Sequence, residues 1–481
     1  MTNAAPDGTF LGYGIPDDVD HVPPGAFDDV QAALRAGQDA GVLRSTAARK
    51  AALRAVLAML EDNEEQIIEA LRTDLRRPRV ESLLADIASV KAECTFALRH
   101  VRSWQRGSFT VSPVVSQPGF GRVVPEPRGV VLIISPWNYP FQLGISPLVG
   151  ALAAGNSVLL KPSELSPACS ALLARLIPQY FDPRVLQVVE GGVQVSTELL
   201  AMKWDHIFFT GSTRVGRVVM QAAAQHLTPV TLELGGKSPA IVAADADLAI
   251  AARRIMWGKF LNAGQTCIAP DYVLVEASVR DALIEELRTA ASAFLDGKPA
   301  ASSDYGRIVN RSHFDRIGHL MDTAGGTTVF GGSRDEQACV IEPTVILDPD
   351  LTSPIMDEEI FGPVLPVVTI DSIERACEFV RERPKPLSLY LFTGSRATQK
   401  YVLANTSSGG VCMNHVILHI GDQRLPFGGV GDSGMGAYHG KAGFDALSHH
   451  KSVLYKPQRP DLRLLYPPYT ERVERIVRRV V

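Results

Sequence analysis

Long apolar runs, clustered cysteines and an excess of charge of one sign are all absent from this sequence. The longest clear apolar run, 129–134, has the length of a strand, whereas a bilayer-spanning helix needs roughly 18 apolar residues or more. The six cysteines are widely spaced, which argues against a zinc cluster and against a small disulfide-bonded secreted scaffold. The 48 basic and 52 acidic residues give a net charge of −4, so no global positive field is available to hold nucleic acid.

Targeting and metal-binding signals are also lacking. The first residues contain Asp, Pro and Gly without the basic and then apolar pattern of a secretion signal. The last residues contain no prenylation motif. We therefore expect a cytoplasmic protein with reduced thiols. His415 and His419 are four positions apart but have no convincing third ligand nearby in the sequence, so no metal site is predicted.

The patterning of the chain predicts an α/β protein of two or three domains. Residues 1–24 are rich in Asp, Pro and Gly and predict an irregular arm, whereas 27–106 have helical periodicity. The valine-rich, Pro- and Gly-punctuated segment 112–129 predicts an exposed hairpin. Continuously apolar strands then alternate with helices over 129–234, which indicates a parallel, doubly wound sheet covered on both faces. A second α/β series begins near 238 and continues to about 425.

Two residues are candidates for covalent chemistry. Cys267 follows a Gly-Gln-Thr turn between a predicted helix and a predicted strand, where a thiolate could act as a nucleophile. The alternative is a buried cysteine that serves as a small apolar side chain. Glu233 ends a strand-like apolar run, and burial there would raise its pKa toward that of a general base. The alternative is a glutamate on an exposed strand face.

Asn138 is a candidate for oxyanion stabilisation. It lies in the segment SPWNYP, directly after the first strand of the α/β series. Ligands of open α/β sheets bind at the carboxyl ends of the strands, so its amide could donate a hydrogen bond to a reacting oxygen. The alternative is an asparagine that only forms the turn before a proline-initiated helix.

Two glycine-rich turns are candidates for phosphate binding. Gly211 lies between a strand end and a helix start, where helix N-terminal amides could take a pyrophosphate. A formal GxGxxG pattern occurs at 429–434, but it follows Leu425-Pro426-Phe427 in a loop-rich region. Because it does not connect a strand to a helix, we reject it as a dinucleotide fingerprint.

Two further segments could contact the sugars of a nucleotide. Lys161 and Glu164 follow the second strand, where an acidic residue often holds a ribose hydroxyl. The alternative is an exposed lysine beside a helix-start Ser-Glu. Glu359 and Phe361 combine a carboxylate with a ring on either side of Ile360, and the alternative is a solvated acidic loop.

Taken in order, eight segments closely resemble the motifs of the aldehyde dehydrogenase superfamily, and in particular its class 3 branch of fatty- and aromatic-aldehyde enzymes. They are SPWNYP, LLKPSE, FTGST, LELGGKSP, NAGQTCIAPDY, EEIFGP, PFGGVGDSGMGAYHGK and YPPY, and the resemblance spans about 27–469. It implies an α/β fold with a doubly wound, Rossmann-like cofactor domain, a second α/β catalytic domain and a small β oligomerisation element. The corresponding boundaries are a cofactor domain at 25–235 with an oligomerisation hairpin at 112–127, a catalytic domain at 236–425, and a return segment with a dimerisation tail at 426–481.

The resemblance also implies an activity and a set of site residues. The expected reaction is oxidation of medium-chain aliphatic or aromatic aldehydes with NAD or NADP, and NAD is slightly favoured because an acid near the ribose 2′ position repels a phosphate. Cys267 would be the nucleophile, Asn138 the oxyanion donor and Glu233 the general base. Tyr139 and Trp257 would line an apolar substrate tunnel, unless both are ordinary core aromatics. The residues implied in cofactor binding are Pro136, Trp137, Lys161, Ser163, Glu164, Gly192, Phe209, Thr210, Gly211, Ser212, Gly216, Leu234, Glu359 and Phe361.

Partners of two kinds are expected. The class 3 resemblance implies a homodimer in which the hairpin and the tail cross between subunits. Residues 471–481 place Val473, Ile476, Val477, Val480 and Val481 on one helical face, with arginines among the other positions. This pattern predicts a short amphipathic helix that docks on a subunit or makes a weak contact with an anionic membrane surface.

Three other functions compete with a hydrolysing dehydrogenase. A cofactor-independent thiol esterase would use Cys267 and Glu233 but would leave Lys161, Gly211 and Glu359 without a task. An aldehyde dehydrogenase that acylates coenzyme A is disfavoured by Glu233, because a base aimed at water would waste the thioester. A non-catalytic relative would not need Asn138, Glu233, Cys267 and Glu359 together.

Overall fold

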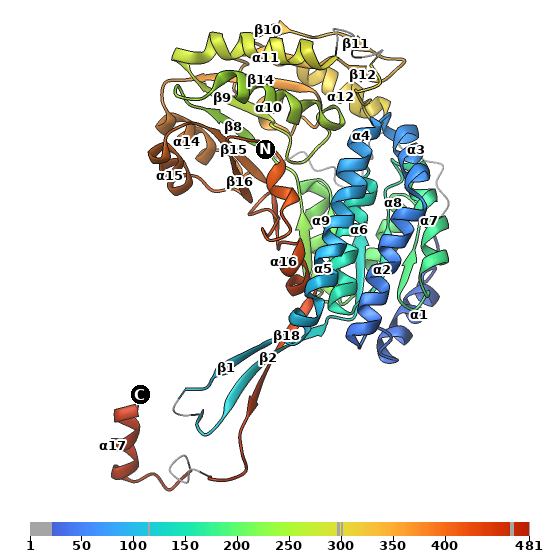
Figure 1. Cartoon of the computed structure of the whole chain (residues 1–481), viewed down its shortest axis with the longest axis vertical. Helices are drawn as coiled ribbons and strands as arrows, with labels where there is room; N and C mark the ends of the chain where they lie inside the picture. The colour runs from blue at the N-terminus through green and yellow to red at the C-terminus, as the bar shows by residue number, and fades with distance from the viewer. Residues whose placement is uncertain (1–21, 114–115, 296–298, 300–301, 462–465, 481) are drawn as a thin grey trace.

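The computed structural model describes residues 22–113, 116–295, 299, 302–461 and 466–480. Two α/β lobes are stacked along the long axis, and a three-stranded arm projects from the lower lobe toward the C-terminal helix (Figure 1). Most of the predicted irregular arm, 1–21, lies outside the described residues, and 22–24 are not helical or extended.

Helices fill the predicted helical region 27–106. Five α-helices flank a π-helical segment at Ser82–Ala88, and Ser45 caps the second of them by accepting a hydrogen bond from the Ala48 amide. A π-helical segment is rare and often marks a functional site, and the sequence pattern did not predict it. The helices are α1 (Asp28–Asp39), α2 (Thr46–Asp62), α3 (Glu64–Leu75), the short α4 (Arg79–Glu81) and α5 (Ser89–Gln105).

The lower lobe contains the predicted doubly wound sheet. Its strand order is β17-β7-β6-β3-β4-β5, with all pairs parallel except β17 with β7. Alternate residues of β3 belong to two cores: Val131 and Ile133 pack with α2, α5, α6 and α7, whereas Leu132 and Ile134 pack with α1, α8 and α9. Both faces are therefore covered, as the continuous apolar runs predicted. The elements are β3 (Val130–Ile134), α6 (Pro140–Ala154), β4 (Ser157–Lys161), α7 (Pro167–Tyr180), β5 (Leu186–Val188), α8 (Val193–Ala201), β6 (His206–Thr210), α9 (Thr213–Gln225), β7 (Val230–Glu233) and β17 (Gly434–Met435).

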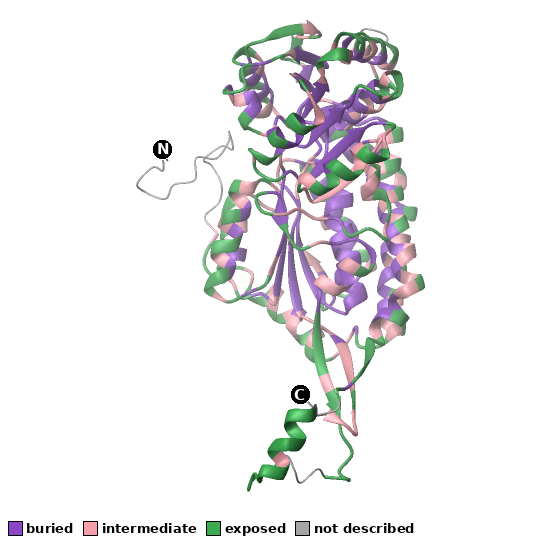
Figure 2. Cartoon of the chain, turned by 90° about the vertical axis from the view of Figure 1, so that its left-hand side faces the viewer, coloured by how far each residue is buried: buried purple, intermediate pink, exposed green. Residues whose placement is uncertain are grey.

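The upper lobe is built on a seven-stranded sheet with the order β10-β13-β14-β9-β8-β15-β16, in which only β10 is antiparallel to its neighbour. The central strands of both sheets are buried, whereas the edge strands β10 and β16 and the arm are half-buried or exposed (Figure 2). The strands are β8 (Pro239–Val242), β9 (Tyr272–Glu276), β10 (Thr327–Phe330), β13 (Thr344–Leu347), β14 (Val364–Ile370), β15 (Ser388–Phe392) and β16 (Gly410–Met413), with a small ribbon of β11 (Arg334–Asp335) and β12 (Val340–Ile341). The helices are α10 (Leu248–Phe260), α11 (Arg280–Leu295), α12 (Arg311–Asp322), α13 (Pro354–Asp357), α14 (Ile373–Arg381) and α15 (Arg396–Asn405).

The arm is an antiparallel sheet of β1 (Ser108–Val111), β2 (Phe120–Pro127) and β18 (Ser448–Tyr455), in the order β1-β2-β18. The predicted hairpin at 112–127 includes β2 but not β1, and the third strand comes from the other end of the chain, after α16 (Gly440–Ala446). The C-terminal helix α17 spans Glu471–Val480. In the described part of the chain, no helix is long and apolar enough to cross a membrane.

Candidate active site

The carboxyl ends of the lower-lobe strands meet at the edge that faces the upper lobe. Ile134 pairs with Lys161 on one side and with Phe209 on the other, and Thr210 pairs with Glu233. The loop that carries Asn138 and the turn that carries Gly211 leave from this same edge. The structure therefore brings together candidate residues that are far apart in the sequence, at the place where open α/β sheets bind ligands.

Asn138 connects this edge to the loop that carries Cys267. Its side-chain Nδ2 donates to the Gln265 carbonyl oxygen at 3.0 Å, and its own carbonyl oxygen accepts from Asn262 Nδ2 at 2.9 Å. The Tyr139 hydroxyl lies 2.6 Å from Thr266 Oγ1. Because Nδ2 has two hydrogens and Gln265 takes one, the second remains available for an oxygen bound beside Cys267.

The residues before Cys267 form an unusual left-handed turn. Asn262, Ala263 and Gly264 have φ values of 51°, 52° and 75°, a conformation that costs an L-residue roughly 1–2 kcal/mol. Contacts from other segments hold it: Asn262 N donates to Glu81 Oε2 at 2.9 Å, and Gln265 Nε2 donates to the Arg307 carbonyl oxygen at 2.9 Å. A side chain at Gly264 would come within 2.3 Å of the Gly362 carbonyl oxygen. Both the turn and this close approach explain why the sequence has glycine there.

Cys267 is half-buried at the end of this loop. Burial raises the pKa of its thiol, and the charges of Glu359 and Glu233 raise it further, whereas hydrogen bonds from the Cys267 and Ile268 amides lower it. These two amides therefore face the sulfur and anything that bonds to it. Since the thiol is neutral at rest, the site needs a base to generate the thiolate.

Glu233 is a candidate for that base, since its charge acts on the Cys267 thiol. It is the last residue of β7, is 3% exposed, and neither carboxyl oxygen has a hydrogen-bond partner among the described residues. Burial raises its pKa well above that of an ordinary glutamate. A buried carboxyl group without partners is costly, so it is typical of a functional position.

Glu359 and Phe361 face the same site from the upper lobe. The Glu359 carboxylate lies so close to Gly235 that a side chain there would come within 1.9 Å of Oε2. Burial, followed by the charge of Asp271, raises the Glu359 pKa to about 8, and a hydrogen bond from the Gly236 amide opposes this. Phe361 has a left-handed backbone, with φ of 47°, and its ring meets the Trp137 ring edge-on at 5.4 Å.

At the same carboxyl edge of the lower-lobe sheet, residues that follow β4 and β6 have features that fit the adenosine half of a dinucleotide. Lys161 Nζ and Glu164 Oε2 form an ion pair at 2.8 Å, and a side chain at Gly192 would lie 3.9 Å from the Glu164 side chain. Ser212 caps α9, whose first-turn amides can receive a phosphate. Gly192 thus leaves open space beside an acceptor suited to ribose hydroxyls, so these residues fit the cofactor. Of the other implied residues, Pro136, Ser163, Gly211 and Leu234 follow strands of this edge, Phe209 and Thr210 end β6, and Gly216 lies in the first turn of α9.

The 429–434 glycine pattern has a structural task instead. It forms a loop that ends in β17, where Gly434 pairs with Glu233. Asp432 accepts a hydrogen bond from Arg217 at 2.9 Å, which fastens the loop to α9. The loop therefore supports the end of β7 and does not join a strand to a helix.

The two residues implied in substrate binding lie in different settings. Tyr139 is buried, its hydroxyl is paired with Thr266, and the Arg77 guanidinium lies 4.4 Å from its ring centroid. Trp257, on α10, is half-buried and meets the His415 ring edge-on at 5.8 Å. Tyr139 is thereby placed next to the Cys267 loop, and a substrate role for either ring stays a prediction.

Two buried residues near the site were not singled out from the sequence. Lys259 is 1% exposed, and its Nζ has no hydrogen-bond partner among the described residues. Burial lowers its pKa to about 8, with Asp271 opposing the shift. Tyr438 has a buried hydroxyl without a hydrogen-bond partner in the part of the chain that the structure describes, and burial first, then the charges of Glu233 and Cys267, raise its pKa. For Lys259 the sequence signal was a lysine inside an apolar helix, whereas no feature of the neighbouring sequence distinguishes Tyr438.

Comparisons with known proteins agree with this geometry. The model of the aldehyde dehydrogenase family matches residues 17–453. The chain is 45% identical to aldehyde dehydrogenase family 3 member H1 of Arabidopsis thaliana, with 93% of each chain covered. It is 46% identical to the dimeric NADP-preferring aldehyde dehydrogenase of Rattus norvegicus, with 90% of this chain and 95% of the relative covered. Among solved structures, the substrate-bound state of Staphylococcus aureus AldH has a TM-score of 0.92 at 41% identity, with 95% of this chain and 99% of that chain covered.

Proposed function

This chain belongs to the aldehyde dehydrogenase family and oxidises aldehydes with NAD or NADP, and we propose that it does so through a thioester formed on Cys267. The observation that carries the proposal is the buried Glu233, whose carboxyl oxygens have no hydrogen-bond partner among the described residues and whose charge acts on the Cys267 thiol. We propose medium-chain aliphatic or aromatic aldehydes as substrates, with the carboxylate as product.

The proposed reaction begins with proton transfer from Cys267. Because the thiol pKa is raised, a base must take the proton, and Glu233 is available to accept it. The sulfur then bonds to the aldehyde carbon, and the second hydrogen of Asn138 Nδ2 and the Cys267 amide donate to the oxyanion. When bound, the nicotinamide serves as the hydride acceptor that makes the step an oxidation.

Hydrolysis of the acylated Cys267 completes the cycle. Glu233 first releases the thiol proton to solvent and then takes a proton from water, and the resulting hydroxide attacks the thioester carbon. The C–S bond breaks, the carboxylate leaves, and the sulfur is free to react again. Asn138 and the Cys267 amide can stabilise this second oxyanion in the same position.

Aldehyde-dependent reduction of NAD or NADP, measured by absorbance with a panel of aliphatic and aromatic aldehydes, tests the proposal. We expect reduction without added coenzyme A, with a free carboxylate as product. Reduction that requires coenzyme A would favour the acylating alternative. Ester cleavage without any aldehyde oxidation or dinucleotide binding would favour the thiol esterase.

Cofactor preference is expected to depend on Glu164. A carboxylate that accepts from the ribose 2′-hydroxyl favours NAD, whereas Lys161 beside it tolerates a phosphate. Glu164→Gln should raise the KM for NAD and lower that for NADP, each by about tenfold, as expected for a hydrogen bond to a charged group. Steady-state kinetics with both cofactors measures this, and an unchanged ratio of the two KM values would contradict the assignment.

We further propose a homodimer that forms through the arm. The rat relative is named as dimeric, and the arm exposes Phe109, Phe120 and Tyr455, whose rings form a stack. Phe120→Lys should shift sedimentation from dimer toward monomer. Leu227→Lys, at an apolar residue that is 91% exposed on the lower lobe, is the matched control and should stay dimeric. A monomeric wild type would rule out the dimer.

A weak contact with an anionic membrane surface is proposed for α17. Ile476 and Val477 are exposed, and Arg475, Arg478 and Arg479 provide positive charge on the same helix. Deletion of 471–481 should reduce co-sedimentation with phosphatidylserine vesicles but leave aldehyde oxidation intact. Unchanged co-sedimentation would remove the membrane role.

We also propose a cytoplasmic location, since all six cysteines are free thiols. Fractionation of cells that express the chain would test it, and recovery in a secreted or organellar fraction would contradict it.

A further inference from the structure

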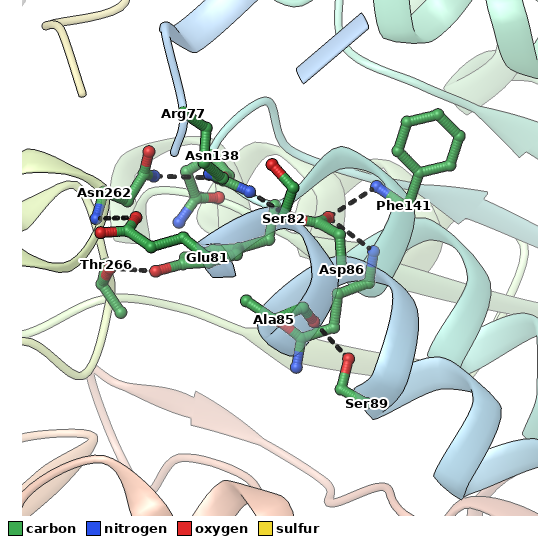
Figure 3. A network of polar contacts seen from close by, with 12 residues as sticks. Arg77, Glu81, Ser82, Ala85, Asp86, Ser89, Asn138, Phe141, Asn262 and Thr266 are labelled. Carbon is green, nitrogen blue, oxygen red and sulfur yellow. Dashed lines mark hydrogen bonds and ion pairs between the residues drawn. The ribbon is translucent and has the colours of Figure 1, made fainter. Parts of the chain in front are cut away.

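A buried ion pair lies beneath the loop that carries Asn138 (Figure 3). Arg77 follows α3 and Asp86 lies in the π-helical segment, and neither side chain has any exposed surface. Arg77 Nη1 donates to Asp86 Oδ2, while Nη2 donates to the carbonyl oxygen of Asn138. The planar guanidinium therefore joins the acid and the Asn138 peptide in one fixed geometry.

The pair also fixes the residues on the C-terminal side of Asn138. Asp86 Oδ1 accepts hydrogen bonds from the Phe141 and Gln142 amides, both at 3.1 Å. These amides belong to the first turn of α6, whose N-cap residue Tyr139 provides no side-chain cap. Asp86 thus caps α6 from another segment of the chain, and a negative charge there also suits the helix dipole.

Fixing the Asn138 peptide in turn fixes the direction of its side chain. The carbonyl oxygen is held by Arg77 and by Asn262 Nδ2, and the side-chain Nδ2 is held by the Gln265 carbonyl oxygen. With both ends of the residue restrained, the remaining Nδ2 hydrogen has one direction available, and that direction decides whether it meets the developing oxyanion.

Stability alone is a poor explanation for this pair. Desolvation of two buried charges largely offsets their attraction, and apolar side chains of similar volume often serve as well. Arg77 Nε has no hydrogen-bond partner among the described residues, so part of the desolvation cost is not compensated. The pair is instead suited to setting the position of a loop, and π-helical segments such as Ser82–Ala88 are frequent at functional sites.

We propose that Arg77, held by Asp86, is a positioning residue for oxyanion stabilisation in this enzyme: it acts through the Asn138 carbonyl oxygen and does not touch the substrate. The proposal rests on the proposed function, in which Asn138 donates to the oxyanion. It extends the active site to the N-terminal helices, because the residue that orients the amide comes from the end of α3.

A double-mutant cycle of Arg77→Lys and Asn138→Ala tests the proposal by the kcat for aldehyde oxidation. Lysine keeps the positive charge, but its ammonium group cannot reproduce the two bonds that the planar guanidinium makes to Asp86 and to the Asn138 carbonyl oxygen. We expect Arg77→Lys to lower kcat by about 10- to 100-fold, the scale of a small misplacement of a catalytic group. Asn138→Ala should lower kcat by about 100- to 1,000-fold. In the double variant the loss should equal that of Asn138→Ala alone, because no amide is left to position.

Arg49→Lys is the matched control. Arg49 is also buried and donates to carbonyl oxygens, those of Leu43 and Ala153, away from the site. We expect both lysine variants to lower the melting temperature, but only Arg77→Lys to lower kcat, with dinucleotide affinity unchanged within about twofold. Equal kcat for Arg77→Lys and wild type would overturn the proposal.

The double-mutant cycle distinguishes failure of the oxyanion assignment for Asn138 from failure of the positioning role of Arg77. If Asn138→Ala leaves kcat unchanged, the oxyanion assignment fails and the positioning role fails with it. If Asn138→Ala lowers kcat and Arg77→Lys lowers kcat by its full factor again in the double variant, only the positioning role fails. Should Arg77→Lys not fold, Asp86→Asn takes its place, since a neutral amide holds Arg77 more weakly, and the same loss of additivity is expected.

Discussion

Cys267→Ala is expected to abolish aldehyde-dependent reduction of NAD or NADP, with a loss of at least about 10⁴-fold in kcat, because no other group can form the thioester. Dinucleotide affinity should stay within about twofold of wild type, since the cofactor residues follow other strands. Absorbance of the reduced nicotinamide measures the first quantity, and fluorescence titration with the reduced dinucleotide measures the second.

Cys377→Ala is the matched control for this experiment. Cys377 is a fully buried cysteine on α14, in the core of the upper lobe. Its truncation should lower the melting temperature by a few degrees at most and leave kcat unchanged. Residual oxidation by Cys267→Ala at more than about one hundredth of the wild-type rate would show that the covalent route is wrong.

Glu233→Gln is expected to block the second half of the reaction more than the first. Hydrolysis of the thioester needs a base, and removal of a general base lowers a rate by about 10²- to 10⁴-fold. Rapid mixing should therefore show one burst of reduced nicotinamide per site followed by a slow steady state. Mass spectrometry of the quenched enzyme should detect acylated Cys267. The burst itself should also be slower than in wild type, because Glu233 accepts the thiol proton in the proposed reaction. A burst at the wild-type rate would show that another base deprotonates Cys267.

The pH dependence of hydrolysis gives the sign of the Glu233 effect. The group acts as a base when ionised, and burial raises its pKa. The wild-type rate should therefore rise as the pH increases through that raised pKa, and Glu233→Gln should flatten this rise. A glutamate whose pKa is raised by folding costs stability as the pH increases above its unfolded value. Thermal unfolding at neutral pH should thus find the variant at least as stable as wild type, and a large loss of stability would contradict the burial argument.

Both predictions depend on a site whose parts come from different segments. The loop that carries Cys267 is in the upper lobe, Glu233 ends a lower-lobe strand, and the side-chain amide of Asn138 donates to the Cys267 loop. The left-handed turn at 262–264 is held by Glu81 and by Gln265. A weakened contact between the lobes should therefore reduce catalysis.

Local patterning determined the secondary structure and the position of most candidate residues along it. Apolar periodicity depends on neighbours two, three or four positions away, so the strands 130–134, 157–161, 206–210 and 230–233 could be predicted from their own residues. Since parallel strands present their carboxyl ends at one edge, the meeting of Asn138, Gly211 and Glu233 followed from the same pattern. The resemblance of the motifs then indicated the chemistry, and the family comparison confirms it.

Only the tertiary structure decided which groups support these residues. The sequence pattern did not predict the bond from Arg77 to the Asn138 carbonyl oxygen, the lack of a described partner for Lys259 Nζ, or the addition of β18 to the arm. The bond and the added strand join segments that are distant in the chain, and the state of Lys259 depends on which polar groups lie outside its reach. Apolar periodicity reflects only neighbours a few positions away, so it does not predict these features. The free energy of burying a charge depends on every group packed around it. The candidate catalytic residues could thus be proposed from the sequence, whereas the residues proposed to orient them required the folded molecule.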